Sequence, residues 1–423
     1  MKKLVHLLLI TFLLVSCGQQ KEPENNLVPD AGNGGITLPE GFSAVVVADE
    51  IGRGRHIVVN NNEDIYVSLR QHDENKGIAC LRDTTGNGKA DIIEYAGEHV
   101  GTGIKLHNGY LYFGSDSAVV RYPIQESKLT PESNWELIAH GFPQEGQHEA
   151  KPMEFDGKGN MYVTVGAPSN ACMEQMRTKG SPGMDPCPIL EYSGGIWKFD
   201  ENMQNQDQLN NGVRYATGIR HAVAIYWNKQ VDELFAVQHG RDQLHQFFPD
   251  MYTTEESAEL PAEEFLMVTE NADFGWPYCY FDQLQNKKVL APEYGGDGTI
   301  QERCENKDGP IMGFPGHVAP NDLLFYTGDM FPERYKNGAF IAFHGSWNRA
   351  PEPQEGYNVV FVPFEGSEPS GDWEIFADGF AGTEPINSTR DAQYRPCGLA
   401  QGPDGSLYIV DSNKGKIWRI IYS

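Results

Sequence analysis

Six short segments of this chain follow one pattern, and this repetition constrains the fold more than any other feature. Each begins with a turn of Asn, Asp, Gly or Lys and continues as a short apolar, β-branched or aromatic run, which is typical of a hairpin leading into a strand. The segments are residues 63–67, 109–113, 159–163, 232–236, 338–342 and 405–409. Six copies of one unit predict an all-β fold, a six-bladed β-propeller, whose closed ring leaves few open sheet edges.

The predicted propeller covers residues 37–423 as one domain. A strand-like run at 42–48 precedes the first repeat, and we expect it to complete the last blade beside residues 416–420. The wider gaps between repeats hold residues 170–192, 247–264 and 281–313. Loops this long are usually functional or cross-linked, so we expect them to wall a pocket on one face.

The first residues predict export. Two lysines, an apolar run over 4–15 and the sequence Leu-Val-Ser-Cys ending at Cys17 resemble a bacterial lipoprotein signal peptide over 1–17, with Cys17 lipidated. An ordinary signal peptide with a chance cysteine is the alternative. The polar residues 18–36 predict a flexible tether. We therefore expect an exported protein, anchored by lipid to a bacterial membrane and facing the periplasm or the cell surface.

The charge and the cysteines narrow the class further. A formal net charge of −26 argues against nucleic acid as a partner, because phosphates require a basic surface, and it favours solubility and cation binding. Six cysteines remain besides Cys17, an even number that suits an oxidising compartment. The predicted disulfides are Cys172–Cys187, Cys279–Cys304 and, because a closed ring makes the first and last blades neighbours, Cys80–Cys397.

One loop carries a calcium-binding pattern. Oxygen donors occupy alternate positions at Asp83, Thr85, Asn87, Lys89 (through its carbonyl) and Asp91, and a glycine permits the sharp turn. The loop lies between two predicted strands, so this would be a hairpin version of the site and a structural ion remote from catalysis. A polar turn without a metal is the alternative.

Histidines and arginines gather in loops beside predicted strand ends. They are His148, Arg220, His221, His239, Arg241, His344, Arg349 and Arg395. Several cations around one propeller axis suit a polyanionic ligand, although each residue alone could be an ordinary surface or core residue. A neutral histidine among arginines has a lowered pKa and can act as a general base. The sequence shows no nucleophile elbow, zinc-protease motif, phosphate loop or dinucleotide fingerprint.

The same loops carry a family resemblance. The segments 274–280, 317–320, 344–349, 357–364 and 395–399 resemble the glucose/sorbosone dehydrogenase family, in its sorbosone-dehydrogenase-like branch, over about residues 40–421. The resemblance implies six blades, the cofactor pyrroloquinoline quinone, and oxidation of a sugar.

The resemblance also implies roles for single residues. His148 matches the family's base and Arg220 its active-site arginine, while His221 replaces an asparagine. Backbone carbonyls at Gly240 and Arg241 match those that bind calcium at the quinone. The implied cofactor-binding set is His221, His239, Gly240, Arg241, His317, His344, Arg349 and Arg395, of which Arg395 matches an arginine that contacts the quinone carboxylates.

Two departures from the family pattern concern this site. Ala167 stands where soluble glucose dehydrogenase has an acid that supports the base, and Glu149 or Asp242 could substitute for it. The family's quinone-binding lysine has no identified counterpart, because residues 346–349 occupy its region.

The resulting hypothesis is oxidation of an aldose or a related sugar aldehyde or lactol, with hydride transfer to the quinone and a separate quinone or cytochrome as electron acceptor. The first alternative is a propeller hydrolase of the gluconolactonase type, which needs Asp, Glu and Asn ligands around an axial metal. The second is a non-catalytic lipoprotein propeller that binds glycans or proteins.

Overall fold

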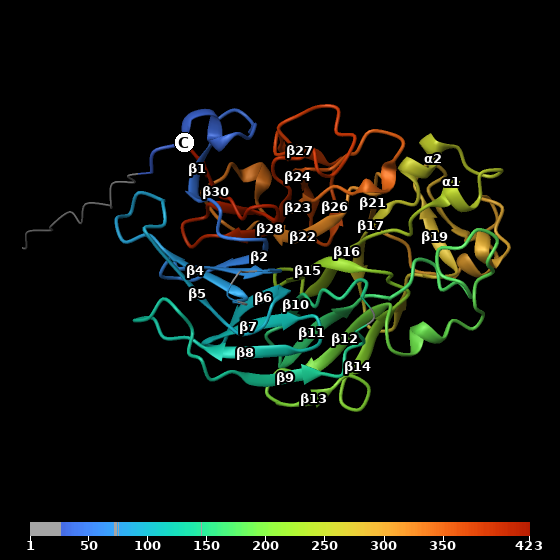
Figure 1. The fold of residues 1–423 in the computed structure, drawn as a ribbon, viewed down its shortest axis with the longest axis horizontal. Helices are drawn as coiled ribbons and strands as arrows, with labels where there is room; N and C mark the ends of the chain where they lie inside the picture. The colour runs from blue at the N-terminus through green and yellow to red at the C-terminus, as the bar shows by residue number, and fades with distance from the viewer. Residues whose placement is uncertain (1–26, 72–73, 75, 145) are drawn as a thin grey trace, which may run out of the picture.

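The computed structural model describes residues 27–71, 74, 76–144 and 146–423. The predicted signal peptide and Cys17 lie outside these residues. Strands dominate the described chain, and the two α-helices, α1 (Leu244–Phe247) and α2 (Thr254–Glu259), lie together in loops at one end (Figure 1). No helix in the described part has the length and apolar character needed to cross a bilayer.

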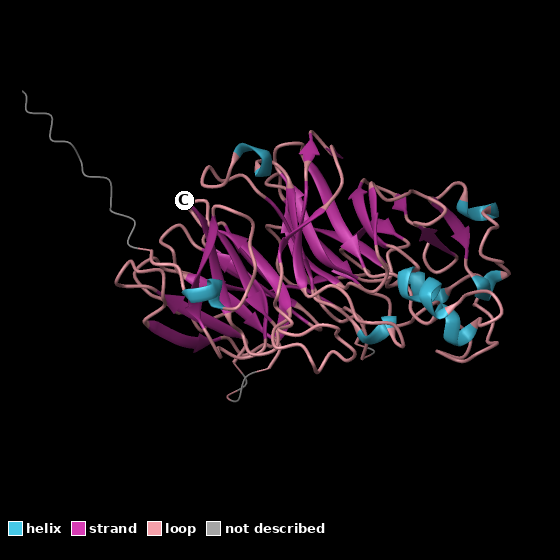
Figure 2. Ribbon diagram, turned by 90° about the horizontal axis from the view of Figure 1, so that it is seen from above, coloured by secondary structure: helices cyan, strands magenta, loops and turns pink. Residues whose placement is uncertain are grey.

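Six sheets form the blades of a propeller, as predicted. Their innermost strands are β2 (Gly54–Val59), β6 (Gly101–His107), β10 (Met153–Phe155), β15 (Ala222–Asn228), β22 (Pro320–Phe325) and β28 (Pro396–Gln401). Each innermost strand contacts the next along the ring, and β28 contacts β2 in turn. Figure 2 shows these sheets packed side by side across the molecule.

The six repeats fall on the second strand of each blade and on the turn before it. These strands are β3 (Ile65–Leu69), β7 (Tyr110–Ser115), β11 (Asn160–Val165), β16 (Glu233–Gln238), β23 (Ala339–Phe343) and β29 (Leu407–Asp411). Every residue of β3, β23 and β29 is buried. Neighbouring blades cover both faces of these strands, which explains why their apolar runs are continuous and not alternating.

The outer strands complete the blades. The third strands are β4 (Ile78–Arg82), β8 (Val119–Pro123), β12 (Gly195–Asp200), β17 (Glu263–Val268), β24 (Asn358–Val362) and β30 (Ile417–Tyr422). The fourth strands are β5 (Ile92–Ala96), β9 (Glu136–His140), β14 (Val213–Thr217), β21 (Met312–Phe314), β27 (Glu374–Ala377) and β1 (Phe42–Ala48). Short additions are β13 (Gln206–Asp207) beside β9, β18 (Ala272–Asp273) beside β14, and the hairpins β19 (Cys279–Asp282)–β20 (Lys287–Leu290) and β25 (Phe364–Glu365)–β26 (Glu368–Pro369).

The ring closes through strands from both ends of the chain. The strand β1 pairs antiparallel with β30, with Phe42 opposite Tyr422 and Ala44 opposite Ile420. The last blade therefore contains three C-terminal strands and one N-terminal strand, as the sequence predicted.

The predicted tether is wrong at its C-terminal end. The Asp30 carboxylate accepts a hydrogen bond from the Val46 amide at 2.7 Å, and the Trp418 indole donates one to the Gly34 carbonyl at 3.3 Å. Ile36 is buried in the core of the last blade. Residues 30–36 therefore pack on the propeller, because β1 carries them along the edge of that blade.

Two of the three predicted disulfides are present, Cys172–Cys187 and Cys279–Cys304. The prediction of a Cys80–Cys397 bond is wrong, because both cysteines are free and buried. Cys80 lies on the third strand of its blade, in the cluster facing the second blade, whereas Cys397 lies on an innermost strand beside Asn321. Neighbouring blades thus hold the two thiols at different distances from the axis.

Candidate functional site

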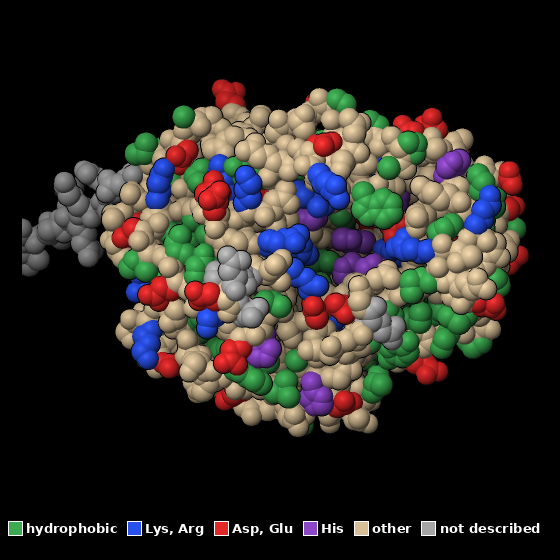
Figure 3. Space-filling model, viewed as in Figure 1, with side chains coloured by type: hydrophobic (Ala, Val, Ile, Leu, Met, Phe, Trp, Pro, Cys, Tyr) green, Lys and Arg blue, Asp and Glu red, His purple; other side chains and the backbone are tan. Residues whose placement is uncertain are grey.

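The candidate site lies where loops of all six blades meet around the axis. Loops that follow the second strands and loops that precede the innermost strands share this face of the molecule. Lys, Arg and His side chains gather around a hollow at its centre, although the surface elsewhere is mixed in charge (Figure 3). We call this hollow the funnel.

The ring of His148, in the loop that leads into β10, is fixed by a backbone carbonyl. Its Nδ1 donates to the carbonyl oxygen of Ala167 at 2.5 Å, which leaves Nε2 as the basic atom of the neutral ring. Neither Glu149 nor Asp242 bonds to it, so the proposed acid substitutes are not its partners: Glu149 accepts from the Gly146 amide and Asp242 pairs with arginines. The carbonyl of Ala167 thus takes the orienting role that an acidic side chain has in the family pattern.

Gly166 allows the close packing behind this ring. A Cβ at that position would lie 2.6 Å from the His148 carbonyl oxygen and 2.7 Å from Nδ1 of His221. His148 itself has a positive φ of 54°, an uncommon conformation for a residue with a side chain. The glycine and the left-handed turn together bring His148 against its neighbour.

At the funnel, the ring of His221 contacts two other histidine rings. The rings of His148 and His221 stack at 4.5 Å, and those of His221 and His239 meet edge to face at 5.0 Å. Burial, helped by the charge of Arg220, lowers the pKa of His148 to about 3. Burial lowers the pKa of His239 to about 4 despite its bond to the Pro320 carbonyl, and that of His221 well below its ordinary value. The three rings are therefore neutral at pH 7.

Arg220 lies beside these rings and is almost fully buried. Its guanidinium donates to the Gly240 carbonyl at 2.7 Å and to Asp242 at 2.8 Å. Burial alone would raise the pKa of Asp242, but the charges of Arg220, His317 and Arg177 outweigh it and hold that pKa well below its usual range. The Nε of Arg220 is buried and has no partner among the described residues.

Arg395 and His344 form the wall contributed by blades five and six. Arg395 donates to the carbonyls of His344 at 3.1 Å and Gly345 at 2.5 Å. The His344 ring is 2.6 Å from the Ser412 hydroxyl, and burial with the charge of Arg395 lowers its pKa well below the ordinary value. The backbone bonds fix the Arg395 side chain as a cation beside a neutral imidazole.

Sequence reasoning missed Arg55, which belongs to the same group. It lies on the innermost strand β2, and its charge lowers the pKa of His344, His239 and Arg395. Its buried Nε has no partner within the described chain. A signal was available, because Arg55–His56 repeats the Arg–His pair at 220–221, each at the inner edge of a blade.

Lys151 was missed as well. It is buried, donates to the Glu149 carbonyl at 2.7 Å, and its charge acts on His221. Burial lowers the pKa of Lys151 to about 8. It is a buried amine near the funnel and a candidate for the lysine that the sequence did not reveal.

Three predicted cofactor-binding residues have protein partners instead. Arg241 forms a buried ion pair with Glu293, and His317 bonds to the Ser257 carbonyl and lies 3.8 Å from Asp242. Arg349 donates to the carbonyls of Ala258 and Gly316 and to Glu259 and Glu355. These side chains hold the walls of the funnel together, and their role as ligand contacts stays a prediction.

Neither predicted calcium position coincides with a metal-binding cluster. In the described part of the chain, no three His, Cys, Asp or Glu side chains converge on one point. Asp83 accepts bonds from the amides of Thr85, Gly86 and Gly88, and Asp91 from Thr84. The Gly240 carbonyl accepts from Arg220. Calcium at either place stays a prediction.

A comparison of the chain with known families finds a match over the whole propeller. The TrAA12-like family model matches residues 36–423. The chain belongs to this family. A pyrroloquinoline quinone-dependent pyranose dehydrogenase of Coprinopsis cinerea is 29% identical over 282 residues, which cover 57% of this chain and 36% of that enzyme. The chain thus matches about a third of the length of that curated relative.

Solved structures share the fold. The holo form of the quinone domain of the Coprinopsis pyranose dehydrogenase has a TM-score of 0.72 at 18% identity, over 91% of this chain and 97% of that one. A calcium structure of a Trichoderma reesei carbohydrate-active enzyme of family AA12 has a TM-score of 0.73 at 17% identity, over 95% and 100%. The resemblance to quinone-dependent sugar dehydrogenases is therefore confirmed at the level of the family.

The residues of the funnel fit an anionic quinone. Pyrroloquinoline quinone carries carboxylates and carbonyl oxygens, which are acceptors of hydrogen bonds. Two buried guanidinium Nε atoms, of Arg55 and Arg220, and the Nδ1 of His221 lack partners in the described chain. Buried polar groups without partners are costly, so an acceptor-rich ligand would relieve them.

Proposed function

We propose that this chain is a pyrroloquinoline quinone-dependent dehydrogenase that oxidises an aldose or a related sugar aldehyde or lactol. Membership of the family supports the reaction class. The observation that carries the proposal is the neutral His148, whose Nδ1 is bonded to a carbonyl and whose Nε2 remains basic beside buried, unpartnered guanidinium donors. A base and a cationic anion-binding wall are what such a reaction needs from the protein.

Each residue then has a defined task. The Nε2 of His148 accepts the proton of the anomeric hydroxyl, while the Ala167 carbonyl keeps the other ring proton in place. Arg220 stabilises negative charge that develops beside it, and Arg55 and Arg395 hold carboxylates. Bound quinone would supply the hydride acceptor, with calcium as a Lewis acid near Gly240, and a separate quinone or cytochrome would receive the electrons.

Reconstitution tests the proposal directly. Purified full-length protein is mixed with pyrroloquinoline quinone and calcium, and reduction of an electron-accepting dye is followed over a panel of aldoses, lactols and polyols. We expect dye reduction that depends on quinone and on a free anomeric centre. Protein without quinone is the blank. Quinone that binds without turnover of any sugar, or no quinone binding at all, would refute the proposal.

The hydrolase alternative has less support. An axial metal needs several carboxylate or amide ligands around the axis, and the funnel offers arginines and neutral histidines. In the described residues no cluster of three metal-ligating His, Cys, Asp or Glu side chains converges there or elsewhere. A lactone panel in the same assay measures this activity independently.

A further inference from the structure

A large cavity lies beside the funnel and not in it. It has a volume of about 750 Å³ and is walled by the loop between β23 and β24 and by the loop before β28. Both loops belong to the face that carries the funnel. A volume of this size suits a small organic ligand. We call it the blade-five cavity.

The blade-five cavity and the funnel adjoin each other on this face, where Tyr357 of the cavity meets Arg395 of the funnel. Tyr357 lines the cavity, and the Arg395 guanidinium lies 5.6 Å from the centre of its ring. The neighbouring Gly356 is pressed against the funnel loop, because a Cβ there would lie 2.9 Å from the Gly345 nitrogen. The Gly345 carbonyl accepts from Arg395. A molecule in the cavity would thus be a near neighbour of one in the funnel.

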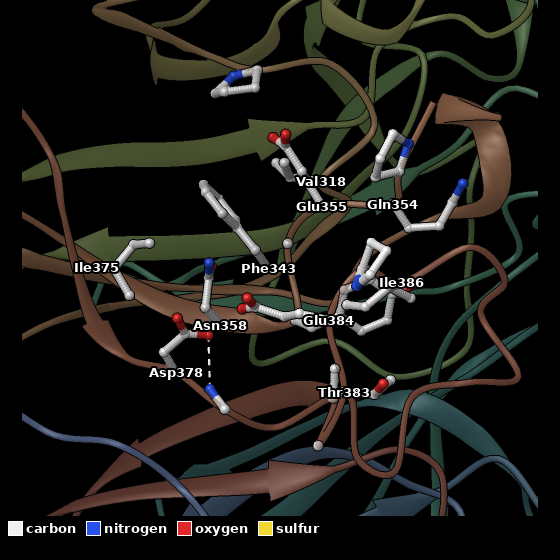
Figure 4. Close-up of a pocket in the computed structure, with 18 of the residues that line it drawn as sticks. Val318, Phe343, Gln354, Glu355, Asn358, Ile375, Asp378, Thr383, Glu384 and Ile386 are labelled. Atoms are coloured by element: carbon white, nitrogen blue, oxygen red, sulfur yellow. Dashed lines mark hydrogen bonds between the residues drawn. The ribbon is translucent and has the colours of Figure 1, made fainter. Parts of the chain in front are cut away.

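The chemistry of the two chambers differs. The funnel is basic, whereas Glu355, Asp378 and Glu384 line the cavity together with the amide of Asn358 and the apolar Phe343 and Ile375 (Figure 4). Within the described chain, Glu384 has no hydrogen bond or ion pair, and almost half of the Ile375 side chain is exposed. Trp373 adds an aromatic surface to the same wall.

Polar atoms at the cavity lack partners. The side-chain oxygens of Gln354, Tyr357 and Asn358 are buried and accept or donate no hydrogen bond within the described residues. Each is a group whose burial without a partner costs free energy, and all three residues line the cavity. Oxygen acceptors beside aromatic and aliphatic surface match a pyranose ring, which has hydroxyl donors at its rim and C–H groups on its faces.

We propose that the blade-five cavity binds a second pyranose unit of an oligosaccharide whose reducing end lies in the funnel. The proposal rests on the proposed function for its second half, because it makes the substrate an oligosaccharide and not a monosaccharide. Its first half, binding of a neutral pyranoside at Asn358 and Glu384, stands without any redox chemistry.

The first experiment measures binding alone. The full-length chain is titrated calorimetrically with methyl β-cellobioside, whose closed anomeric centre cannot be oxidised. We expect millimolar binding that weakens roughly 3–10-fold in Asn358→Ala and in Glu384→Ala, the usual effect of one lost hydrogen bond. Glu368→Ala, an exposed acid of the same blade outside the cavity, is the matched control and should bind like the wild type.

The outcomes distinguish failure of the pyranoside site from failure of the proposed dehydrogenase function. No binding of methyl β-cellobioside, or binding that both cavity variants leave unchanged, overturns the second site even if the enzyme is active. In the reconstituted enzyme, kcat/KM should rise from glucose to cellobiose to cellotriose, and the ratio of cellotriose to glucose should fall in Glu384→Ala but not in Glu368→Ala. Absence of dye reduction with intact pyranoside binding would refute only the dehydrogenase.

Discussion

The orientation of His148 depends on a carbonyl and not on a carboxylate. The Ala167 oxygen fixes the tautomer, but it lacks the full charge that would raise the pKa of the ring. Burial, with the charge of Arg220, lowers the pKa of His148 to about 3, so the ring is neutral over the whole physiological range. Protonated His148 is therefore a strong acid, and a proton that it accepts must pass quickly to another acceptor.

Two substitutions should separate the roles at the funnel. His148→Ala should lower turnover by roughly 10²–10⁴-fold, the usual contribution of a positioned base, with little change in quinone affinity. Arg395→Ala should weaken quinone retention and spare turnover at saturating quinone, because it removes a charge-assisted contact. Stopped-flow turnover and equilibrium quinone titration measure the two effects. If both variants behave as the wild type does, these assignments are wrong.

The histidine cluster should make the protein acid-sensitive. The folded state keeps His148 and His239 neutral with pKa values of about 3 and 4, whereas the unfolded chain has the ordinary value of 6.5. The unfolded state therefore binds more protons, and stability falls below pH 6.5 by about 1.4 kcal/mol per pH unit for each group. Glu263 opposes this, since burial raises its pKa to about 8 and favours its protonated form when folded.

Denaturant unfolding at pH 7, 6 and 5 measures that dependence. His239→Gln should show a shallower loss of unfolding free energy on acidification than the wild type, although it starts from lower stability. Parallel curves for the two proteins would show that His239 is not one of the groups responsible.

The sequence predicted the funnel better at strand ends than in the longer loops. His148, Arg220 and Arg395 precede innermost strands, where the propeller directs them to the axis. Arg241 and Arg349 pair with Glu293 and Glu259, which lie 52 and 90 residues away in the chain. Nothing local reveals which distant carboxylate a loop arginine will meet.

At the level of elements, two disulfides hold the loops behind the base. Cys172–Cys187 and Cys279–Cys304 pack in one cluster with Ala167 and Trp276, and the Trp276 indole donates to the Asn170 carbonyl. Cross-linked loops therefore support the carbonyl that orients His148. Their pairing could be predicted from closeness in sequence, whereas Cys80 and Cys397 required knowledge of strand positions.

Removing the Cys172–Cys187 bond tests this support. The bond spans 15 residues, so the double variant Cys172→Ser/Cys187→Ser should lose about 3 kcal/mol of stability. Because the loop adjoins Ala167, turnover should fall as well. Cys80→Ser, which removes a free buried thiol remote from this cluster, is the comparison. Equal turnover in the double variant and the wild type would separate the disulfide from the site.

The turn between β4 and β5 tests the calcium prediction. Chelator should lower the melting temperature of the wild type, because an ion bound only to the folded state stabilises it by mass action. Asp83→Ala should lower stability on its own, since Asp83 caps three amides of the turn, but it should also abolish most of the chelator response. An equal response in the variant would place the ion elsewhere.

At the level of the whole molecule, we propose that lipid on Cys17 anchors the propeller to a membrane. Cys17→Ser should release the protein from membranes into the soluble fraction of cells, as followed by fractionation and immunoblotting. The first residues seen on the propeller, near Asp30, follow Cys17 by about a dozen positions, so the released protein should keep its fold. Retention of the variant on membranes would contradict the lipid anchor.

The pairing of β1 with β30 determines when this protein can finish folding. The last blade cannot be completed until its C-terminal strands have arrived, so a chain that emerges N-terminus first waits with one strand of that blade unpaired. During this interval β1 is an open sheet edge, exposed to other chains and to proteases. Closure of the ring is then the moment at which the funnel, whose Arg55 and Arg395 come from the first and last blades, first exists as one site.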